Sequence, residues 1–389
     1  MIFLSAAFSL VLIFAYIFID VEIRDQYFGI FVLKKASGFG IEIVNDIYPD
    51  ELKRKIISLD LDPSTKSFYI RKNSKKIYPR LNYIWDKKRG RGFVFNYMAE
   101  DKVLLTVLSR FKTDTDETEN GIFIGGELPG SEFKRDENEM NDTGMAYYDG
   151  TRWYHVWCTS NEGLASGTTM EPIPPVKWKF LGSDVLKYTP QTLVLKSTHQ
   201  ALSDGNPLLI ERFGIFIAGK PFMILVQKIT NISNNVASYY YVYGDEPWLG
   251  NYGTSVGNIG WVSDHLIKYE EDIDTKKYNY IGLCDYGNDV IGEKGNFTGM
   301  ANFIEWIYDR PDVAFIVNQE NSVINKPKKK TPLSSKLSRF IGAQWGPVYL
   351  QPKGYQVMVL AIGMAQGSKD GKIPVKPDVY FDVSAFPYF

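Results

Sequence analysis

The sequence predicts a mostly β protein, a large antiparallel β-sandwich preceded by a single N-terminal transmembrane helix. The helix is predicted from Ile2 to Ile19, an unbroken apolar run without charge that has about the length needed to span the hydrocarbon core of a bilayer. No stretch after Asp20 keeps an apolar spacing of three and four residues, so further long helices are not expected. Short runs of β-branched and aromatic residues recur instead, bounded by Gly, Pro and Asn, which is typical of strands.

The apolar run has two interpretations, an uncleaved anchor or a cleaved signal peptide. No basic segment precedes the run and no small-x-small cleavage site follows it, which favours the anchor. The residues after the run, with Asp20, Glu22 and Asp25 against Arg24, give a weak orientation signal. We expect residues 1–20 to be the anchor and residues 21–389 to form a domain on the periplasmic or extracellular side.

Charge and cysteine content exclude several classes of protein. The chain has 44 basic and 45 acidic side chains, so no overall field attracts it to nucleic acid. Two cysteines, Cys158 and Cys284, are too few for a disulfide scaffold or a four-cysteine zinc site. They are predicted either to form one bridge or to be buried as free thiols.

The clearest strand pattern runs from Phe213 to Tyr243. Apolar, β-branched and aromatic runs cover Phe213–Ile217, Phe222–Ile229 and Val236–Tyr243. Turn-forming residues separate the runs, so the pattern predicts a three-stranded meander. A second turn precedes Tyr355–Ala365, whose nearly continuous apolar sequence predicts a strand covered on both faces.

Other segments share this strand-like composition, and one segment is predicted as a helix. The helix is predicted over Asp50–Ile57 because Pro49 suits a first helical turn. No internal repeat of fixed period is visible, and two packed antiparallel sheets are the simplest way to bury so many strands. The remaining predicted strands are Gly92–Tyr97, Val103–Arg110, Trp153–Cys158, Thr192–Lys196, Asn302–Ile307, Val313–Val317 and Val379–Val383.

A basic segment, Lys326–Arg339, contains six Lys or Arg residues together with prolines and serines. Its composition predicts a solvated loop. Binding of this loop to an anionic polymer or to lipid headgroups is the alternative.

The order of strands and turns resembles the galactose-mutarotase-like β-supersandwich. The resemblance covers Asn206–Ala365 and consists of a strand, an Ile-Thr-Asn hairpin, a Tyr-rich strand, the turn sequence Gly346–Gly354 and a long apolar strand. This superfamily includes aldose epimerases and sandwich domains of many polysaccharide lyases and hydrolases. The resemblance implies a concave sheet face that often holds sugar.

The epimerase activity of that superfamily is not expected here. Aldose epimerases use a histidine acid in an Asn-His-x-Tyr-Phe-like run together with a glutamate base. None of the three histidines, His155, His199 and His265, stands in such a run.

Several aromatic residues stand beside carboxylates or a histidine, a combination that suits sugar binding. The apolar face of a pyranose stacks on an aromatic ring, while the sugar hydroxyls need hydrogen-bond partners. Aromatic residues of a sandwich core are the alternative interpretation. An acid and a base for catalysis also lie among these residues, so a binding protein and an enzyme both remain consistent with the pattern. The candidate ligand-binding residues are Trp153, His155, Asp245, Glu246, Trp248, Tyr252, Glu305 and Trp306.

A calcium loop is predicted from Asp116 to Glu127. The segment has glycine in the sixth position and glutamate in the twelfth, nearly the pattern of an EF-hand loop. Asp116, Thr118, Asn120 and Glu127 would supply the oxygen ligands, and an acidic surface turn is the alternative.

These patterns favour a membrane-anchored protein outside the cytoplasm that binds or modifies carbohydrate, with calcium as the only expected cofactor. The alternative is a non-enzymatic component of the cell envelope that holds protein partners through a sheet edge or the basic segment.

Overall fold

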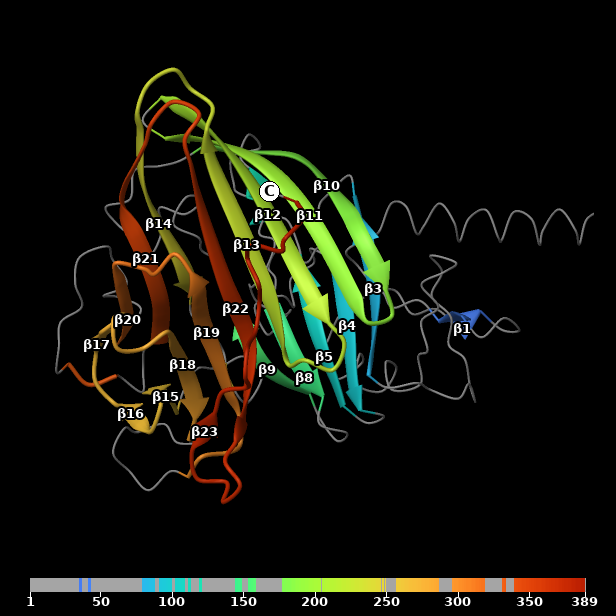
Figure 1. Ribbon diagram of the computed structural model, residues 1–389. Helices are drawn as coiled ribbons and strands as arrows, with labels where there is room; N and C mark the ends of the chain where they lie inside the picture. Colours follow the sequence, from blue (N-terminus) through green and yellow to red (C-terminus); the bar gives the residue numbers. More distant parts are fainter. Residues whose placement is uncertain are drawn as a thin grey trace, which may run out of the picture.

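The computed structural model in Figure 1 is built from strands. No helix long and apolar enough to cross a membrane occurs in the described part of the chain. The predicted anchor and the predicted helix Asp50–Ile57 both lie outside that part. The structure describes residues 35–36, 41–42, 79–87, 91–99, 102–108, 111–112, 119–120, 144–148, 153–158, 177–203, 205–245, 247, 249, 257–286, 296–318, 331–333 and 339–388.

The largest sheet, called here the large sheet, is antiparallel and has ten strands. The short strand β23 (Pro374–Val375) pairs with the end of β22. The other nine strands follow the order β10 (Lys177–Thr189), β11 (Thr192–Ser203), β12 (Asn206–Ile217), β13 (Phe222–Asn231), β22 (Tyr355–Gly367), β19 (Ala301–Tyr308), β18 (Tyr280–Asp285), β15 (Asn258–Val262) and β16 (His265–Ile267).

Two smaller antiparallel sheets complete the main body. The four-stranded sheet has the order β14 (Ala237–Asp245), β21 (Arg339–Leu350), β20 (Val313–Asn318) and β17 (Glu271–Ile273). The five-stranded sheet has the order β3 (Arg80–Asp86), β4 (Arg91–Ala99), β5 (Lys102–Leu108), β8 (Gly144–Tyr148) and β9 (Trp153–Cys158). Two short pairs join β1 (Lys35–Ala36) to β2 (Ile41–Glu42) and β6 (Phe111–Lys112) to β7 (Glu119–Asn120).

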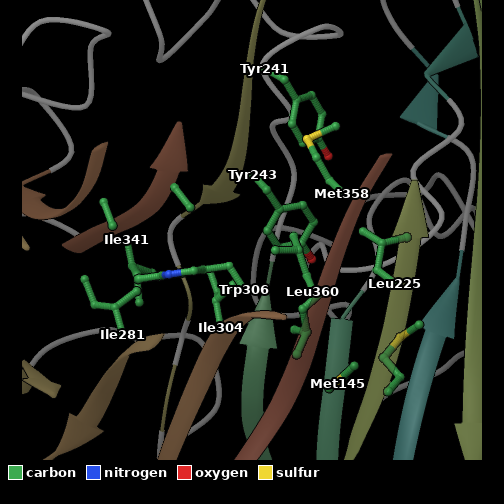
Figure 2. Close-up of a cluster of buried hydrophobic side chains, with 14 of the residues drawn as sticks. Met145, Leu225, Tyr241, Tyr243, Ile281, Ile304, Trp306, Ile341, Met358 and Leu360 are labelled. Carbon is green, nitrogen blue, oxygen red and sulfur yellow. The ribbon is translucent and has the colours of Figure 1, made fainter. Parts of the chain in front are cut away.

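The main core lies between the large sheet and the two smaller sheets. Leu225 and Leu360 enter it from the large sheet, Tyr241 from the four-stranded sheet and Leu104 and Met145 from the five-stranded sheet. Figure 2 shows this cluster, with the tyrosines of β14 facing β22. The face of the large sheet that lines this core is called here the inner face. The prediction of a large antiparallel sandwich is therefore confirmed, with two smaller sheets on one side of the large one.

Strand β22 is covered on both faces, as its apolar sequence predicts. Met358, Leu360 and Ile362 point into the main core. The alternate residues Val359 and Ala361 belong to a second cluster on the opposite face of the large sheet, called here the outer face. Successive side chains of a strand point to opposite faces, so a doubly covered strand needs an unbroken apolar run.

An extended segment, residues 376–388 and called here the strap, covers part of the outer face. Phe381, Phe386 and Tyr388 pack against the outer cluster, and Phe386 meets the ring of Phe213 edge-on at 5.2 Å between centroids. The predicted strand Val379–Val383 is wrong, because these residues belong to no strand. The alternation that suggested a strand is real, but the segment is held by side-chain packing instead of a hydrogen-bonded ladder.

The predicted three-stranded meander is also wrong. Strands β12 and β13 pair as expected, but β14 crosses to the four-stranded sheet and pairs with β21. The crossing is stabilised by the buried side chain of Asn231, whose Nδ2 donates to the backbone oxygens of Asn235 (2.7 Å) and Leu350 (2.9 Å). Turn-forming residues therefore build a corner between two sheets here, where the sequence suggested a hairpin.

Two further predictions are decided by burial. Arg339, predicted in the solvated basic segment, is fully buried because it begins β21 and pairs there with Asn318 of β20. Cys284 is a buried free thiol, so the alternative of a bridge to Cys158 is not formed. Burial raises the pKa of the Cys284 thiol well above its usual value, which keeps the group neutral.

Candidate functional site

Glu305 is the candidate site residue whose surroundings are best defined. It lies on β19, where Phe303 and Glu305 face the outer side of the large sheet, while Ile304 and Trp306 face the main core. Tyr280 of β18 is its direct neighbour across one ladder. The small residue Ala361 of β22 is its neighbour across the other.

The Glu305 carboxylate is bonded on both oxygens. Asn279 Nδ2 donates to Oε1 at 2.7 Å, and Lys376 Nζ of the strap donates to Oε2 at 2.7 Å. The ion pair is well shielded from water, since the side chains of Lys376 and Glu305 are 14% and 8% exposed. A carboxylate, an amide and an ammonium group thus converge at one point of the outer face.

The surroundings of Glu305 favour the protonated form of its carboxyl group more than water does. Burial raises the pKa of Glu305 above its ordinary value, and nearby Asp378 adds to this rise. The hydrogen bond and charge of Lys376 and the hydrogen bond of Asn279 act in the opposite direction without cancelling the effect of burial. A raised pKa makes a carboxyl group a better proton acceptor than an ordinary exposed carboxylate.

Aromatic rings frame the ammonium group. Lys376 Nζ lies 5.6 Å from the centre of the Tyr280 ring and 5.5 Å from that of Phe303, within the range of cation–π attraction. The Tyr280 hydroxyl accepts a hydrogen bond from the backbone N–H of Ser263 at 2.7 Å. Trp261 meets the Tyr280 ring edge-on at 5.3 Å. The group formed by Asn279, Tyr280, Glu305 and Lys376 is called here the Glu305 site.

Trp306, the sequence neighbour of Glu305, lies on the other side of the sheet. Its side chain is 5% exposed and packs in the main core, close to Ile341 and Ile304 in Figure 2. Its Nε1 is buried and has no hydrogen-bond partner among the described residues. Since adjacent strand residues face opposite ways, Glu305 and Trp306 do not line one shared surface.

The other predicted ligand-binding residues are only partly placed by the structure. Trp153 and His155 lie on β9, the edge strand of the five-stranded sheet, opposite Tyr148 and Ala146 of β8. Strand β9 lies against β19 and β22 of the large sheet.

Asp245 ends β14 opposite Ile341. Glu246, Trp248 and Tyr252 lie outside the described residues. The nearby Leu249 is buried and exchanges two hydrogen bonds with the Asn258 side chain.

The calcium prediction remains a prediction. Asn120 belongs to the short strand β7, whereas Asp116, Thr118 and Glu127 lie outside the described residues. No group of three or more His, Cys, Asp or Glu side chains within the described ranges could hold a metal ion.

Sequence reasoning found Glu305 but missed its partners. Asn279 lies 26 residues before Glu305 in the sequence, and Tyr280 follows it directly. Lys376 lies 71 residues after Glu305. Tyr280 is the first residue of an apolar strand and could have been recognised as a ring at a sheet surface. Lys376 carries no local signal, because only the path of the strap brings it over β19.

Comparisons with known proteins give a likeness of fold. No family model matches the chain, and no curated protein matches it either. Among solved structures it is similar to a galactose mutarotase-like protein from Clostridium acetobutylicum, with 7% identity and a TM-score of 0.34 over 75% of this chain and 100% of that one. It is also similar to a galactose mutarotase related enzyme from Lactobacillus acidophilus, with 10% identity and a TM-score of 0.29 over 76% of this chain and 100% of that one.

A third similar structure is the GH36 α-galactosidase of Geobacillus stearothermophilus, with 9% identity and a TM-score of 0.31 over 75% of this chain and 42% of that one. At such identities and TM-scores the likeness concerns the fold alone and assigns no activity to this chain.

Proposed function

We propose that the chain is a membrane-anchored protein outside the cytoplasm that binds or modifies carbohydrate, and that the Glu305 site holds the sugar. The observation that carries the proposal is the convergence of Glu305, Asn279 and Lys376 beside the Tyr280 ring. Carboxylate, amide and ammonium groups together offer both acceptors and donors for hydroxyl groups. The ring supplies the apolar surface on which a pyranose face stacks.

Each group has a distinct part in the proposal. Lys376 and Asn279 donate to sugar oxygens, while Glu305 accepts from a hydroxyl and orients the ring over Tyr280. If the sugar is also modified, Glu305 is the group whose raised pKa suits proton transfer. The anchor at residues 1–20 and calcium at Asp116, Thr118, Asn120 and Glu127 belong to the same proposal and rest on the sequence pattern alone.

The proposal is tested by binding of the full-length protein to a broad glycan and polysaccharide array. We expect a specific hit, and at least about a tenfold loss of retention for Glu305→Gln and Lys376→Gln, since a lost charged contact of about 1.4 kcal/mol corresponds to tenfold. Glu271→Gln is the matched control, because the Glu271 side chain is 39% exposed and faces only His265 among the ion pairs of the described residues, with 3.7 Å between Oε2 and Nε2.

Melting curves of all variants show whether the fold is kept. A blank array with folded protein, or equal retention by Glu305→Gln and the parent protein, would contradict the proposal. Either result would favour the alternative of a cell-envelope protein with protein partners.

A further inference from the structure

Two exposed tyrosines stand on the part of the outer face that the strap leaves open. Directly opposed residues of neighbouring strands share one face of a sheet. Tyr308 of β19 opposes Val359 of β22, and Val359 belongs to the outer cluster. Tyr355 lies four residues before Val359 on β22 and therefore faces the same way. The side chains of Tyr308 and Tyr355 are 52% and 62% exposed.

Other aromatic residues that β12, β13 and β19 place on the outer face are buried. Phe213, Phe222 and Phe303 all belong to the outer cluster. Tyr388, near the end of the strap, stacks on Phe213 of β12 at 6.2 Å between ring centroids. The phenylalanines therefore build the core on this face, whereas the two exposed tyrosines present a ring and a polar hydroxyl group to solvent.

The two tyrosines lie in line with the Glu305 site. Glu305 opposes Ala361 of β22 on the outer face, and Tyr308 follows Glu305 three residues later on β19. Ala361 and Tyr355 are six residues apart on β22, which corresponds to about 20 Å at about 3.3 Å per residue. This distance exceeds the length of one sugar ring, so a single sugar held at Glu305 cannot reach Tyr355.

Hydrogen-bonding groups accompany the tyrosine that is farther from Glu305. Lys228 Nζ lies 5.0 Å from the centre of the Tyr355 ring, and the half-buried Thr230 opposes Tyr355 across the β13–β22 ladder. The ammonium group donates hydrogen bonds, and the threonine hydroxyl both donates and accepts them. Tyr308, Tyr355, Lys228 and Thr230 are called here the tyrosine track.

Charges of both signs flank the tyrosine track. Lys228 and Arg310 supply positive charge, and Asp309 and Asp312 supply negative charge. Because neither sign predominates, no strong field selects a charged partner. In the described strands β19 and β22 the exposed large side chains are the two tyrosines. The aliphatic surface that a bilayer would bury is therefore missing from these strands.

We propose that the ligand is a linear, uncharged chain of several sugars, which occupies the Glu305 site and continues over the tyrosine track. The proposal rests on the proposed function of the Glu305 site and adds the class of carbohydrate that this site takes. Sugar rings farther along the chain stack on Tyr308 and Tyr355. Lys228 and Thr230 form hydrogen bonds with hydroxyl groups of the sugar beside Tyr355.

The test measures how the affinity of the full-length protein depends on the length of the sugar chain. Linear glucan, mannan and galactan series, from the single sugar to the six-unit chain, are titrated by calorimetry. In at least one series we expect the six-unit chain to bind at least about tenfold more tightly than the single sugar, a ratio that corresponds to about 1.4 kcal/mol. Glu305→Gln should weaken the binding of every length in that series.

Tyrosine variants show which surface provides the gain in affinity with chain length. Tyr308→Thr combined with Tyr355→Thr removes both rings but keeps residue types that suit strands. This double variant should cancel the gain without weakening the binding of the single sugar. Tyr308→Phe combined with Tyr355→Phe keeps the rings and should keep most of the gain. Tyr349→Thr is the matched control, because Tyr349 is 66% exposed on β21 of the four-stranded sheet, and it should bind like the parent protein.

The outcomes separate the tyrosine track from the Glu305 site, once melting curves show that all variants are folded. Equal affinity for one and six units, with weaker binding by Glu305→Gln, would overturn the track and leave the proposed function intact. A gain that survives the double threonine substitution would also overturn the track. Absence of binding in all three series would overturn the proposed class of carbohydrate, while a hit on another sugar in the glycan array would still support the proposed function.

Discussion

The two faces of the large sheet are buried by different means. The inner face packs against two other sheets, whose strands are fixed by their own ladders. The outer face is covered in part by the strap, which belongs to no strand between residues 376 and 388. The inner side chains of β22 can be exposed only when hydrogen-bonded sheets separate. The outer side chains are covered by the strap, which can detach by local unfolding while every sheet stays intact.

The largest expected effect comes from the inner face. Ile362→Ala is expected to lower the free energy of unfolding by about 2–5 kcal/mol, because Ile362 is fully buried in the main core and its loss leaves a cavity. Urea unfolding measures the change. Ile362→Val, which removes a single methylene, is the graded control and should cost about 0.5–1.5 kcal/mol.

An intermediate effect is expected from the strap. Phe386→Ala should cost less than about 3 kcal/mol, below the usual range for a buried phenylalanine, because the strap can detach before the sheets unfold. Hydrogen exchange should show faster opening of residues 376–388, while β22 stays protected. If hydrogen exchange became faster by the same factor in β22 and in the strap, the strap would not detach independently of the sheets.

The smallest effect is a change in pH dependence at the Glu305 site. Burial raises the pKa of Glu305 above its ordinary value of 4.5, so the native state binds this proton more tightly than the unfolded state. The resulting stability is fully present below pH 4.5 and is lost as pH rises through the raised pKa.

Glu305→Gln cannot titrate and should lack this loss of stability. Melting temperatures of the two proteins, measured from pH 4 upward in steps, would reveal the difference. Parallel curves for the parent protein and Glu305→Gln would show that burial does not raise the pKa of Glu305 in the folded protein.

Strand identity was largely predictable from the sequence, but strand partners were not. Trp153–Cys158 was predicted with the bounds of β9, and the two-sided burial of β22 followed from its unbroken apolar run. Local sequence records which residues suit a pleated, buried surface. The partner of β14 depends on β21, about a hundred residues later, and nothing in Asn231–Asn235 distinguishes a corner from a hairpin.

The candidate site shows the same limit. A glutamate beside aromatic residues could be selected from sequence, yet the face it occupies depends on the register of β19 with β18 and β22. The alternation of β19 places Glu305 and Trp306 on opposite faces. Lys376 reaches Glu305 only because the strap crosses the outer face, a path that no short pattern encodes.

The central place of β22 also constrains the order in which the fold is made. The ribosome produces β13 and β19 well before β22, which then enters between them. Until that moment the nascent chain displays two unpaired apolar strand edges that are not yet joined to each other. Such edges favour association with other chains, so the synthesis of this protein should depend on chaperones that shield them until β22 emerges.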